Sequence, residues 1–376
     1  MQNEKSEIDP GGLLEYSVVF SDRSLNHMSQ SFQGVMRDIA ATLKRVYKSQ
    51  SVILVPGGGT YGMEAVARQF ATDKSCLVIR NGWFSYRWTQ IFEMGSIPSD
   101  SKVLKASQIS EENNAPFCPP AIDEVVESIK KNRPEVVFAP HVETSAGIIL
   151  PDDYLKALGK AVHEVSGILV LDCVASGALW VDMEATGVDV LISAPQKGWS
   201  GSPCSGLIML SSLAVEKLGA TKSTSFATDL RKWKEIMEAY ENGGHAYHAT
   251  MPTDSLRQFH RVMNETERFG FVQAKKNQQA LGRKVRDLLG EYQVNSVAER
   301  GFEAPSVVVS YTEDSQVQNG AKFSDLGIQV AAGVPLMCDE PKDFQTFRIG
   351  LFGLDKLANV DRTVERLKTV LAQVYQ

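Results

Sequence analysis

Short apolar runs alternate along this chain with longer segments in which hydrophobic residues recur at helical spacing. Residues 29–47, for example, carry apolar positions every three or four residues, which predicts an amphipathic helix. Short apolar runs bounded by turn residues predict buried strands. Their alternation with helices is typical of a mainly parallel sheet with helices on both faces. The predicted strands are Ser51–Val55, Leu77–Ile79, Val136–Ala139, Ile168–Leu171 and Val188–Ile192, and the predicted helices include 61–70, 122–131 and 152–165.

The pattern changes in the last third of the chain. Helical spacing is predicted over 233–240 and 253–289, followed by short strands at 307–311 and 347–351 and a final helix over 359–374. A shift from alternating elements to helices and short strands indicates a second unit. We therefore expect an N-terminal arm (1–25), a large domain (26–264) and a smaller α+β domain (265–376).

Composition narrows the possible functions. The 376 residues carry a net charge of −6 without a long basic or acidic block, which disfavours nucleic-acid binding and docking to anionic membranes. Apolar runs all fall short of the roughly 20 residues that span a bilayer. The five cysteines are scattered, which is typical neither of a disulfide framework nor of a zinc site. Together with a polar N-terminus, this favours a cytoplasmic protein.

Chemically suggestive residues follow the predicted strands. The Gly57–Thr60 run, the Asn81-Gly82 pair, residues 141–145, Asp172 and Lys197 each come directly after an apolar run or close to its end. Ligands of parallel sheets bind outside the carboxyl ends of the strands. These residues are therefore expected to converge on a single site at one edge of the sheet.

Lys197 and Asp172 suggest the chemistry of that site. A lysine at the mouth of a buried strand can serve as an amine nucleophile toward an aldehyde cofactor, of which pyridoxal phosphate is the common one. A carboxylate such as Asp172 would keep that cofactor's ring nitrogen protonated. The alternatives are a solvated loop lysine and a helix N-cap aspartate.

Other residues add to this hypothesis. The Gly57–Thr60 run joins a strand to a helix and suits a small phosphate, although its spacing is neither that of a P-loop nor that of a dinucleotide site. Phe84 and its neighbour Trp83 could cover a flat ring or belong to the core. Arg348, a charge inside an apolar strand, could bind a carboxylate or pair with Asp343 or Glu340. His141 is expected to be hydrogen-bonded within a loop, and the histidines at 245–250 lack the pattern of a metal site.

In their order along the chain, these segments resemble the class V aminotransferases of fold type I, which are pyridoxal-phosphate enzymes. The alanine–glyoxylate and serine–glyoxylate aminotransferases are the most similar group. The resemblance runs from about residue 26 to the C-terminus and is strongest over 56–65, 81–88, 141–147, 171–178, 193–206 and 347–353. It implies a large domain with a mainly parallel seven-stranded sheet and a smaller α+β domain.

The resemblance also implies roles for individual residues. Lys197 is similar in position to the Schiff-base lysine, Asp172 to the ring-nitrogen partner, and Arg348 to the clamp for the α-carboxylate of the substrate. Tyr247 and Thr250 match a pair that reaches the cofactor phosphate of the neighbouring subunit, which implies a homodimer with shared active sites. Further matches to cofactor-contacting residues are Gly58, Gly59, Thr60, Phe84, Thr144, Val174 and Gln196.

The implied reaction is transamination between a small amino acid, alanine or serine, and a 2-oxo acid, glyoxylate or pyruvate. Two segments differ from the family pattern: residues 16–32 lack its Pro-Gly-Pro opening, and the 330–345 loop before Arg348 is distinctive. Three alternatives therefore stay open. They are a 2-aminoethylphosphonate transaminase, a cysteine desulfurase or other β-lyase that uses Cys338, and a non-catalytic ligand-binding module, which would not need both Asp172 and Lys197.

Overall fold

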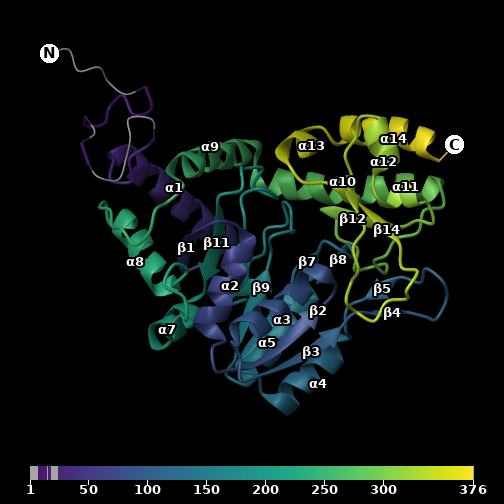
Figure 1. Cartoon of the computed structure of the whole chain (residues 1–376), viewed down its shortest axis with the longest axis horizontal. Coiled ribbons are helices and arrows are strands. Elements are labelled where there is room, and N and C mark those ends of the chain that lie inside the picture. The colour runs from purple at the N-terminus through teal and green to yellow at the C-terminus, as the bar shows by residue number, and fades with distance from the viewer. Residues whose placement is uncertain (1–6, 15, 18–23, 376) are drawn as a thin grey trace.

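The computed structural model describes residues 7–14, 16–17 and 24–375, and its largest element is a seven-stranded sheet (Figure 1). The strands of this sheet are β1 (Ser51–Pro56), β2 (Ser75–Arg80), β3 (Asp100–Lys105), β6 (Val136–Pro140), β9 (Ile168–Asp172), β10 (Val190–Ser193) and β11 (Ser205–Leu210). Their order is β1-β11-β10-β9-β6-β2-β3. Only β11 runs antiparallel to its neighbours within this sheet, which confirms the prediction of a mainly parallel sheet.

Helices connect and cover these strands. They are α1 (Gln30–Tyr47), α2 (Gly59–Phe70), α3 (Trp83–Gly95), α4 (Ile122–Asn132), α5 (Asp152–Glu164), α6 (Met183–Thr186), α7 (Ser212–Ala220) and α8 (Leu230–Glu241). Helix α1 packs against β1 and buries an apolar stripe that includes Phe32, Met36, Ile39 and Leu43, all fully buried. The central strands β6, β9 and β10 are buried on both faces, as their near-continuous apolar runs require, whereas the edge strand β3 is exposed or half-buried along its length.

The C-terminal elements gather beside this sheet, coloured green to yellow in Figure 1. They are α10 (Phe271–Glu291), β12 (Val307–Tyr311), α11 (Ser315–Gln318), α12 (Ala321–Asp325), β13 (Ala331–Ala332), β14 (Thr346–Gly350), α13 (Leu354–Ala358) and α14 (Val360–Val374). β12, β14 and β13 form an antiparallel sheet whose apolar side chains share a second core with α10 and α14. Two small hairpins complete the strands: β4 (Ser107–Gln108) with β5 (Phe117–Cys118), and β7 (Val142–Glu143) with β8 (Ile148–Ile149).

Two local predictions need correction. The helix expected over 253–289 is two helices, α9 (Thr253–Phe269) and α10, because Gly270 takes a φ of +98° that ends the first. The residue that caps α5 is Pro151 rather than an aspartate. Asp152 and Asp153 lie in the first turn instead, where their charges still interact favourably with the helix dipole.

Two further predictions keep their status. The boundary placed after residue 264 falls inside α9, whose buried residues Leu256, Phe259 and Met263 pack in the large core, and the domain division stays a prediction. The proposed arm (1–25) includes residues 1–6, 15 and 18–23, which lie outside the described part of the chain, and residues 18–23 also belong to segment 16–32. Among the described helices, none has the length and apolar character needed to cross a membrane.

Candidate active site

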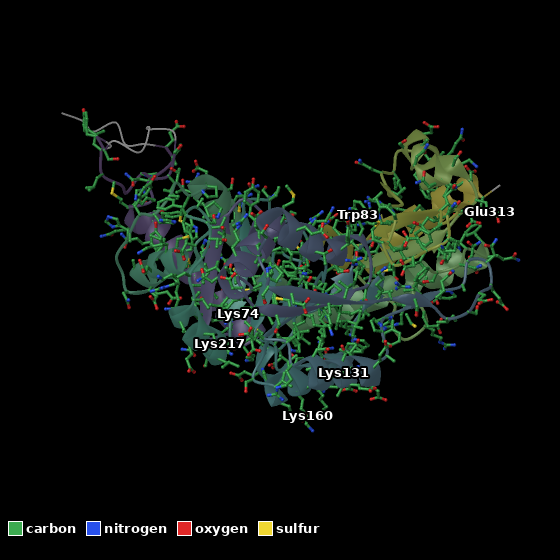
Figure 2. The ribbon with its side chains drawn as sticks, turned by 60° about the horizontal axis from the view of Figure 1, so that its bottom comes forward. Lys74, Trp83, Lys131, Lys160, Lys217 and Glu313 are labelled. Carbon is green, nitrogen blue, oxygen red and sulfur yellow. The ribbon has the colours of Figure 1, made fainter. Side chains whose placement is uncertain are left out.

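Most of the predicted site residues, though not Tyr247 and Thr250, lie at the carboxyl edge of the large sheet. Asp172 ends β9 and pairs in register with Ile192 of β10, while Lys197 follows β10 after a short loop. On the other side of β9, the backbone carbonyl of Asp172 accepts a hydrogen bond from His141 N at 2.8 Å. In Figure 2, Trp83, which follows β2, lies in the upper half of the view, whereas Lys74, directly before β2, lies lower, near Lys217.

Lys197 is half-buried beside an aromatic ring. Its Nζ lies 4.9 Å from the centroid of the Phe352 ring. Burial lowers the pKa of the Lys197 amine, and the charge of Arg348 lowers it further. A lysine of this kind has a larger neutral fraction near pH 7 than a solvated lysine, which is what an amine nucleophile requires.

Asp172 ends the strand next to β10, the strand that leads to Lys197, and the pKa of its carboxyl group is raised. Burial raises the pKa of Asp172 to about 6, although a hydrogen bond from Val174 N at 2.9 Å favours the ionised form. The charge of Glu143 raises this pKa as well, and the guanidinium of Arg87 opposes the rise. A carboxylate with so few partners is suited to accept a hydrogen bond from a cationic ring nitrogen.

The start of α2 forms a cradle of glycines. Gly58 caps the helix without a side chain, and a Cβ at Gly58 would meet only open space. At Gly59 a Cβ would lie 2.7 Å from a methyl of Val174, so this position needs glycine for the close approach of that residue. Thr60 places its hydroxyl at the same helix start, 2.9 Å from Nη1 of Arg87. Free backbone N–H groups at a helix start suit a phosphate.

A buried carboxylate fixes the aromatic residues of the site. Glu143 is fully buried and accepts hydrogen bonds from the backbone N–H groups of Phe84 and Ser85 at 3.2 and 2.9 Å. The hydroxyl of Ser145 accepts a further bond from Trp83 N at 2.8 Å. The start of α3 is therefore satisfied by side chains from β7 and the turn after it, which holds Phe84 at the sheet edge. The sequence indicated only a polar segment here.

Two guanidinium groups approach the Phe84 ring. The Arg87 guanidinium carbon lies 5.2 Å from the ring centroid, and that of Arg348 lies 5.7 Å away. Arg348 donates from Nε to the Ala332 carbonyl at 2.8 Å and forms no ion pair with any described residue, while the Glu340 carboxylate accepts from backbone N–H groups of its own loop. The predicted alternative, a salt bridge to Asp343 or Glu340, is therefore wrong. The remaining donors of Arg348 suit a planar anion. No motif in the sequence pointed to Arg87.

Several buried polar atoms that follow strands of the large sheet lack a protein partner. Oε1 of Gln196 is buried without a hydrogen bond to any described residue, and so are both side-chain polar atoms of Asn81. Buried polar groups without partners are rare and call for a ligand or solvent to complete them. Together with the open space at Gly58, this fits a bound cofactor with polar substituents. Thr144 lies half-buried in the turn after β7.

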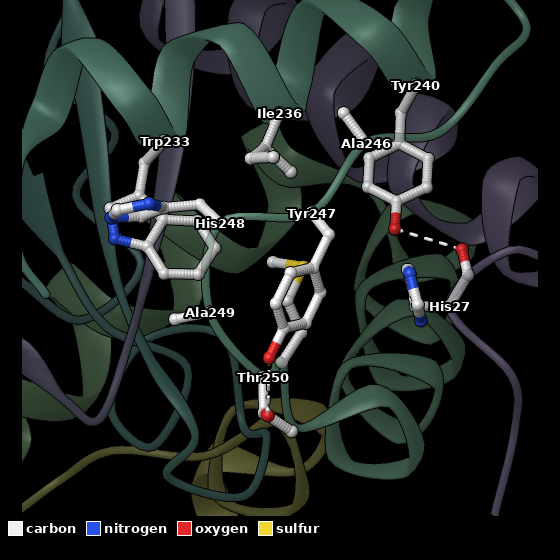
Figure 3. Close-up of a pocket in the computed structure, with 10 residues that line it drawn as sticks. His27, Trp233, Ile236, Tyr240, Ala246, Tyr247, His248, Ala249 and Thr250 are labelled. Carbon is white, nitrogen blue, oxygen red and sulfur yellow. Dashed lines mark hydrogen bonds between the residues drawn. The ribbon is translucent and has the colours of Figure 1, made fainter. Parts of the chain in front are cut away.

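Tyr247 and Thr250 line a small pocket together with His27, Trp233 and Tyr240 (Figure 3). The Tyr247 hydroxyl is 3.3 Å from the Thr250 hydroxyl, and its ring packs 5.6 Å from that of His27. No hydrogen bond or ring contact among the described residues joins the pair to Lys197, Asp172 or Phe84. Tyr247 is 58% exposed, so it is free to contact another chain.

Cys338 and His141 do not have the character of reactive groups. Cys338 is buried, and burial raises the pKa of its thiol to about 12, which disfavours the thiolate that a desulfurase or β-lyase nucleophile needs. His141 is hydrogen-bonded from Nδ1 to Ser176 at 2.6 Å, as predicted. Burial lowers the pKa of His141 to about 3, so its ring is neutral.

Comparisons with known proteins agree with this geometry. No family model matches the chain. It is 28% identical over 260 residues to alanine–glyoxylate aminotransferase 1 of Saccharomyces cerevisiae, a match that covers 64% of each chain. It is 23% identical over 364 residues to the alanine–glyoxylate aminotransferase of Rattus norvegicus, which covers 93% of this chain and 82% of the relative. It is 26% identical over 351 residues to the 2-aminoethylphosphonate–pyruvate transaminase of Bacillus cereus, covering 92% and 90%.

Solved structures give the same result for the fold. The alanine–glyoxylate aminotransferase of a Nostoc species superposes with a TM-score of 0.76 at 22% identity, covering 92% of this chain and 89% of that one. An aspartate aminotransferase of Thermus thermophilus superposes with a TM-score of 0.76 at 22% identity, covering 93% of each. These comparisons confirm the predicted fold type I architecture, the resemblance to class V aminotransferases, and the enzyme class, aminotransferase.

Proposed function

We propose that the chain transfers the amino group of a small amino acid, alanine or serine, to a 2-oxo acid, glyoxylate or pyruvate, with pyridoxal 5′-phosphate as cofactor. The observation that carries this proposal is the placement of Lys197 and Asp172 at the ends of neighbouring strands, the first with a lowered pKa and the second with a raised one. Opposite shifts on an amine and a carboxyl group at one sheet edge are typical of acid–base chemistry. The names of the sequence relatives support the donor and acceptor classes.

The placement of several residues supports a proposal for how the cofactor is held. The start of α2 at Gly58, Gly59 and Thr60 would bind its phosphate, and Phe84 would cover its ring. Gln196, whose Oε1 lacks a partner, would contact a polar substituent, with Thr144 and Val174 lining the same space. When bound, pyridoxal phosphate supplies an aldehyde to the amine and a ring that accepts electrons from the α-carbon of the substrate.

The side chains of this chain would perform the remaining tasks. Lys197 would take the α-proton of the substrate on Nζ and would deliver it to the former aldehyde carbon of the cofactor, which requires the neutral amine that its environment favours. Asp172, ionised above pH 6, would hold a proton on the ring nitrogen of the cofactor. Arg348 would bind the α-carboxylate through donors that its bond to Ala332 leaves available.

A second candidate substrate is 2-aminoethylphosphonate. The two guanidinium groups at Phe84, from Arg87 and Arg348, together suit a doubly charged phosphonate better than one arginine would. The similarity to the Bacillus cereus transaminase named for that substrate is a second reason to test it. Cysteine desulfuration is disfavoured by the buried, weakly acidic Cys338.

We also propose that the protein is a homodimer and that it is cytoplasmic. Tyr247 and Thr250 would reach the cofactor phosphate of a second copy, so that a homodimer shares its active sites; the exposed position of Tyr247 supports this. Five cysteines without disulfides favour the reducing cytoplasm.

A spectroscopic test separates these candidates. Purified protein with added pyridoxal phosphate should gain a visible absorption band that Lys197→Ala lacks and that Lys102→Ala, a change at an exposed lysine, retains. Addition of alanine or serine should bleach the band and release the corresponding 2-oxo acid. If only 2-aminoethylphosphonate bleaches it, the second candidate holds. If the cofactor produces no band, or no donor changes it, the proposed function is wrong.

A further inference from the structure

The loop between β13 and β14, residues 333–345, docks onto the large sheet. The carbonyl of Met337 accepts a hydrogen bond from Arg80 Nη1 at 3.2 Å, and the thiol of Cys338 donates to the Arg80 carbonyl at 3.4 Å. Next to them, Asp339 forms an ion pair with Lys105 at 2.7 Å. Arg80 ends β2 and Lys105 ends β3, so three successive loop residues contact the edge at which the candidate active site lies.

The loop holds a costly conformation in order to make these contacts. Met337 and Asp339 have φ angles of +62° and +61°, which are uncommon for residues other than glycine. The carboxylate of Glu340 stabilises the turn by accepting hydrogen bonds from the backbone N–H groups of Leu336, Met337 and Cys338 at 2.7, 3.1 and 2.9 Å. This arrangement buries the thiol of Cys338 between the two sheets. Strain of this kind persists only where the surrounding contacts impose it.

Both ends of the loop support Arg348. The loop begins after Ala332 at the end of β13, and the Ala332 carbonyl accepts a hydrogen bond from Nε of Arg348. The loop ends at the start of β14, the strand that carries Arg348. On the other side, Arg80 is followed by Asn81-Gly82 and then by the first turn of α3 with Phe84. The contacts therefore close a ring from Arg348 through the loop to Arg80, along the chain to Phe84, and back across 5.7 Å to Arg348.

We propose that the 333–345 loop is a latch that positions Arg348 over Phe84 for binding the substrate carboxylate. Arg80 and Lys105 are its positioning residues on the large sheet. The inference rests on the proposed function, because it assigns the latch to the carboxylate subsite of that reaction. An opened latch lets the β13–β14 hairpin move away from Phe84, which weakens substrate binding, whereas Lys197 and Asp172 keep their places on the large sheet.

Lys105→Glu tests the latch at a half-exposed position at the end of β3. It places a second carboxylate opposite Asp339, and the KM for the amino donor should rise about three- to fivefold with kcat changed less than about twofold. A compensating change, Asp339→Lys in the Lys105→Glu background, should restore KM. The matched control is Lys102→Glu on the same strand, since Lys102 contacts Asn132 and not the loop.

Arg80→Lys tests the buried contact. Lysine cannot reproduce the fork with which Arg80 bonds both Met337 and Thr89, so KM should rise about tenfold. A fall in kcat with KM unchanged in both Arg80→Lys and Lys105→Glu would overturn the latch.

Alkylation of Cys338 gives a readout that does not depend on turnover. Iodoacetamide labelling resolved by peptide mass should be several times faster at Cys338 in Lys105→Glu and Arg80→Lys than in the wild type, with buried Cys204 unchanged as internal reference. Unchanged labelling of Cys338 in both variants would overturn the latch. If the wild type turns over no donor, the proposed function fails, while the labelling still decides whether Arg80 and Lys105 hold the loop.

Discussion

Glu143 and Ser85 are joined by two hydrogen bonds: Oε2 of Glu143 accepts from the backbone N of Ser85 at 2.9 Å and from its hydroxyl at 2.7 Å. The other carboxylate oxygen accepts from the backbone N and the hydroxyl of Ser145 at 3.0 and 2.7 Å. A fully buried carboxylate thus replaces water at the start of α3, where N–H groups have no partner within the helix. The aromatic cover of the site depends on this carboxylate.

Glu143→Gln should therefore cost both stability and cofactor affinity. The amide has only one oxygen acceptor and places an NH₂ group against donors, so we expect a loss of roughly 2–3 kcal/mol in the free energy of unfolding. Urea denaturation of the cofactor-free protein measures this, and titration with pyridoxal phosphate should show weaker binding because Phe84 loses its support. Glu127→Gln, at an exposed position on α4, is the control. A Glu143→Gln protein as stable as this control would refute the role of the carboxylate.

Asp172→Asn should stabilise the cofactor-free protein at alkaline pH. The folded-state pKa of Asp172 is raised to about 6 from 3.8, so the folded chain binds this proton more tightly than the unfolded chain does. The bound proton on Asp172 stabilises the fold fully below pH 3.8, and this stabilisation is lost as the pH rises through 6. Asparagine stays neutral at every pH. The free energy of unfolding of the variant should therefore exceed that of the wild type by roughly 1–3 kcal/mol at pH 8 and by little near pH 4.

Chemical denaturation at the two pH values tests this, with Asp343→Asn at an exposed site as the reference. If Asp172→Asn raised the free energy of unfolding equally at pH 4 and pH 8, the ionised carboxyl group of Asp172 in the wild type would not be destabilised by burial. Activity should fall sharply in the same variant, because the ring nitrogen of the cofactor loses its anionic partner.

The amine of Lys197 should titrate differently when its surroundings change. Burial is the larger cause of its lowered pKa, and the charge of Arg348 is the second. Phe352→Ala admits water to Nζ, and Arg348→Gln removes the charge, so each should move the pKa of Lys197 upward. Acylation of the cofactor-free protein across a pH series, read at the Lys197 peptide, reports this. The profile of the Lys102 peptide should stay the same in all three proteins, and an unmoved Lys197 midpoint in both variants would contradict the assigned causes.

The sequence indicated the site residues that belong to strand ends, because Asp172 ends the apolar run of β9 and Lys197 follows that of β10 after a short loop. It did not indicate Glu143 as the support of α3, since its partner Ser85 lies 58 positions away and no local pattern joins them. Arg80 and Cys338 lie 258 positions apart and meet only after the two sheets pack together. The helix break at Gly270 was missed because the apolar spacing continues on both sides of it. Contacts distant in sequence leave no periodic signal, whereas buried strands do.

Hybrid dimers offer a test of the shared active site. In one chain Lys197→Ala removes the amine, and in the other Tyr247→Ala with Thr250→Ala removes the two hydroxyls that contact each other at 3.3 Å. We expect each homodimer to be nearly inactive. Suppose that the hydroxyl pair of each chain serves the active site of the other chain. In a hybrid dimer, the site that lacks the amine of Lys197 then also lacks the two hydroxyls, and the second site keeps all three groups.

An equal mixture that exchanges subunits at random contains about half hybrids, so it should regain about a quarter of the wild-type activity. Refolding the two variants together and measuring turnover and bound cofactor tests this, with separately refolded proteins mixed afterwards as the control. If Tyr247 and Thr250 acted on Lys197 of their own chain, every site in the hybrid would carry a defect. The mixture would then stay as inactive as its components, and the exposed position of Tyr247 would need another explanation than a partner subunit.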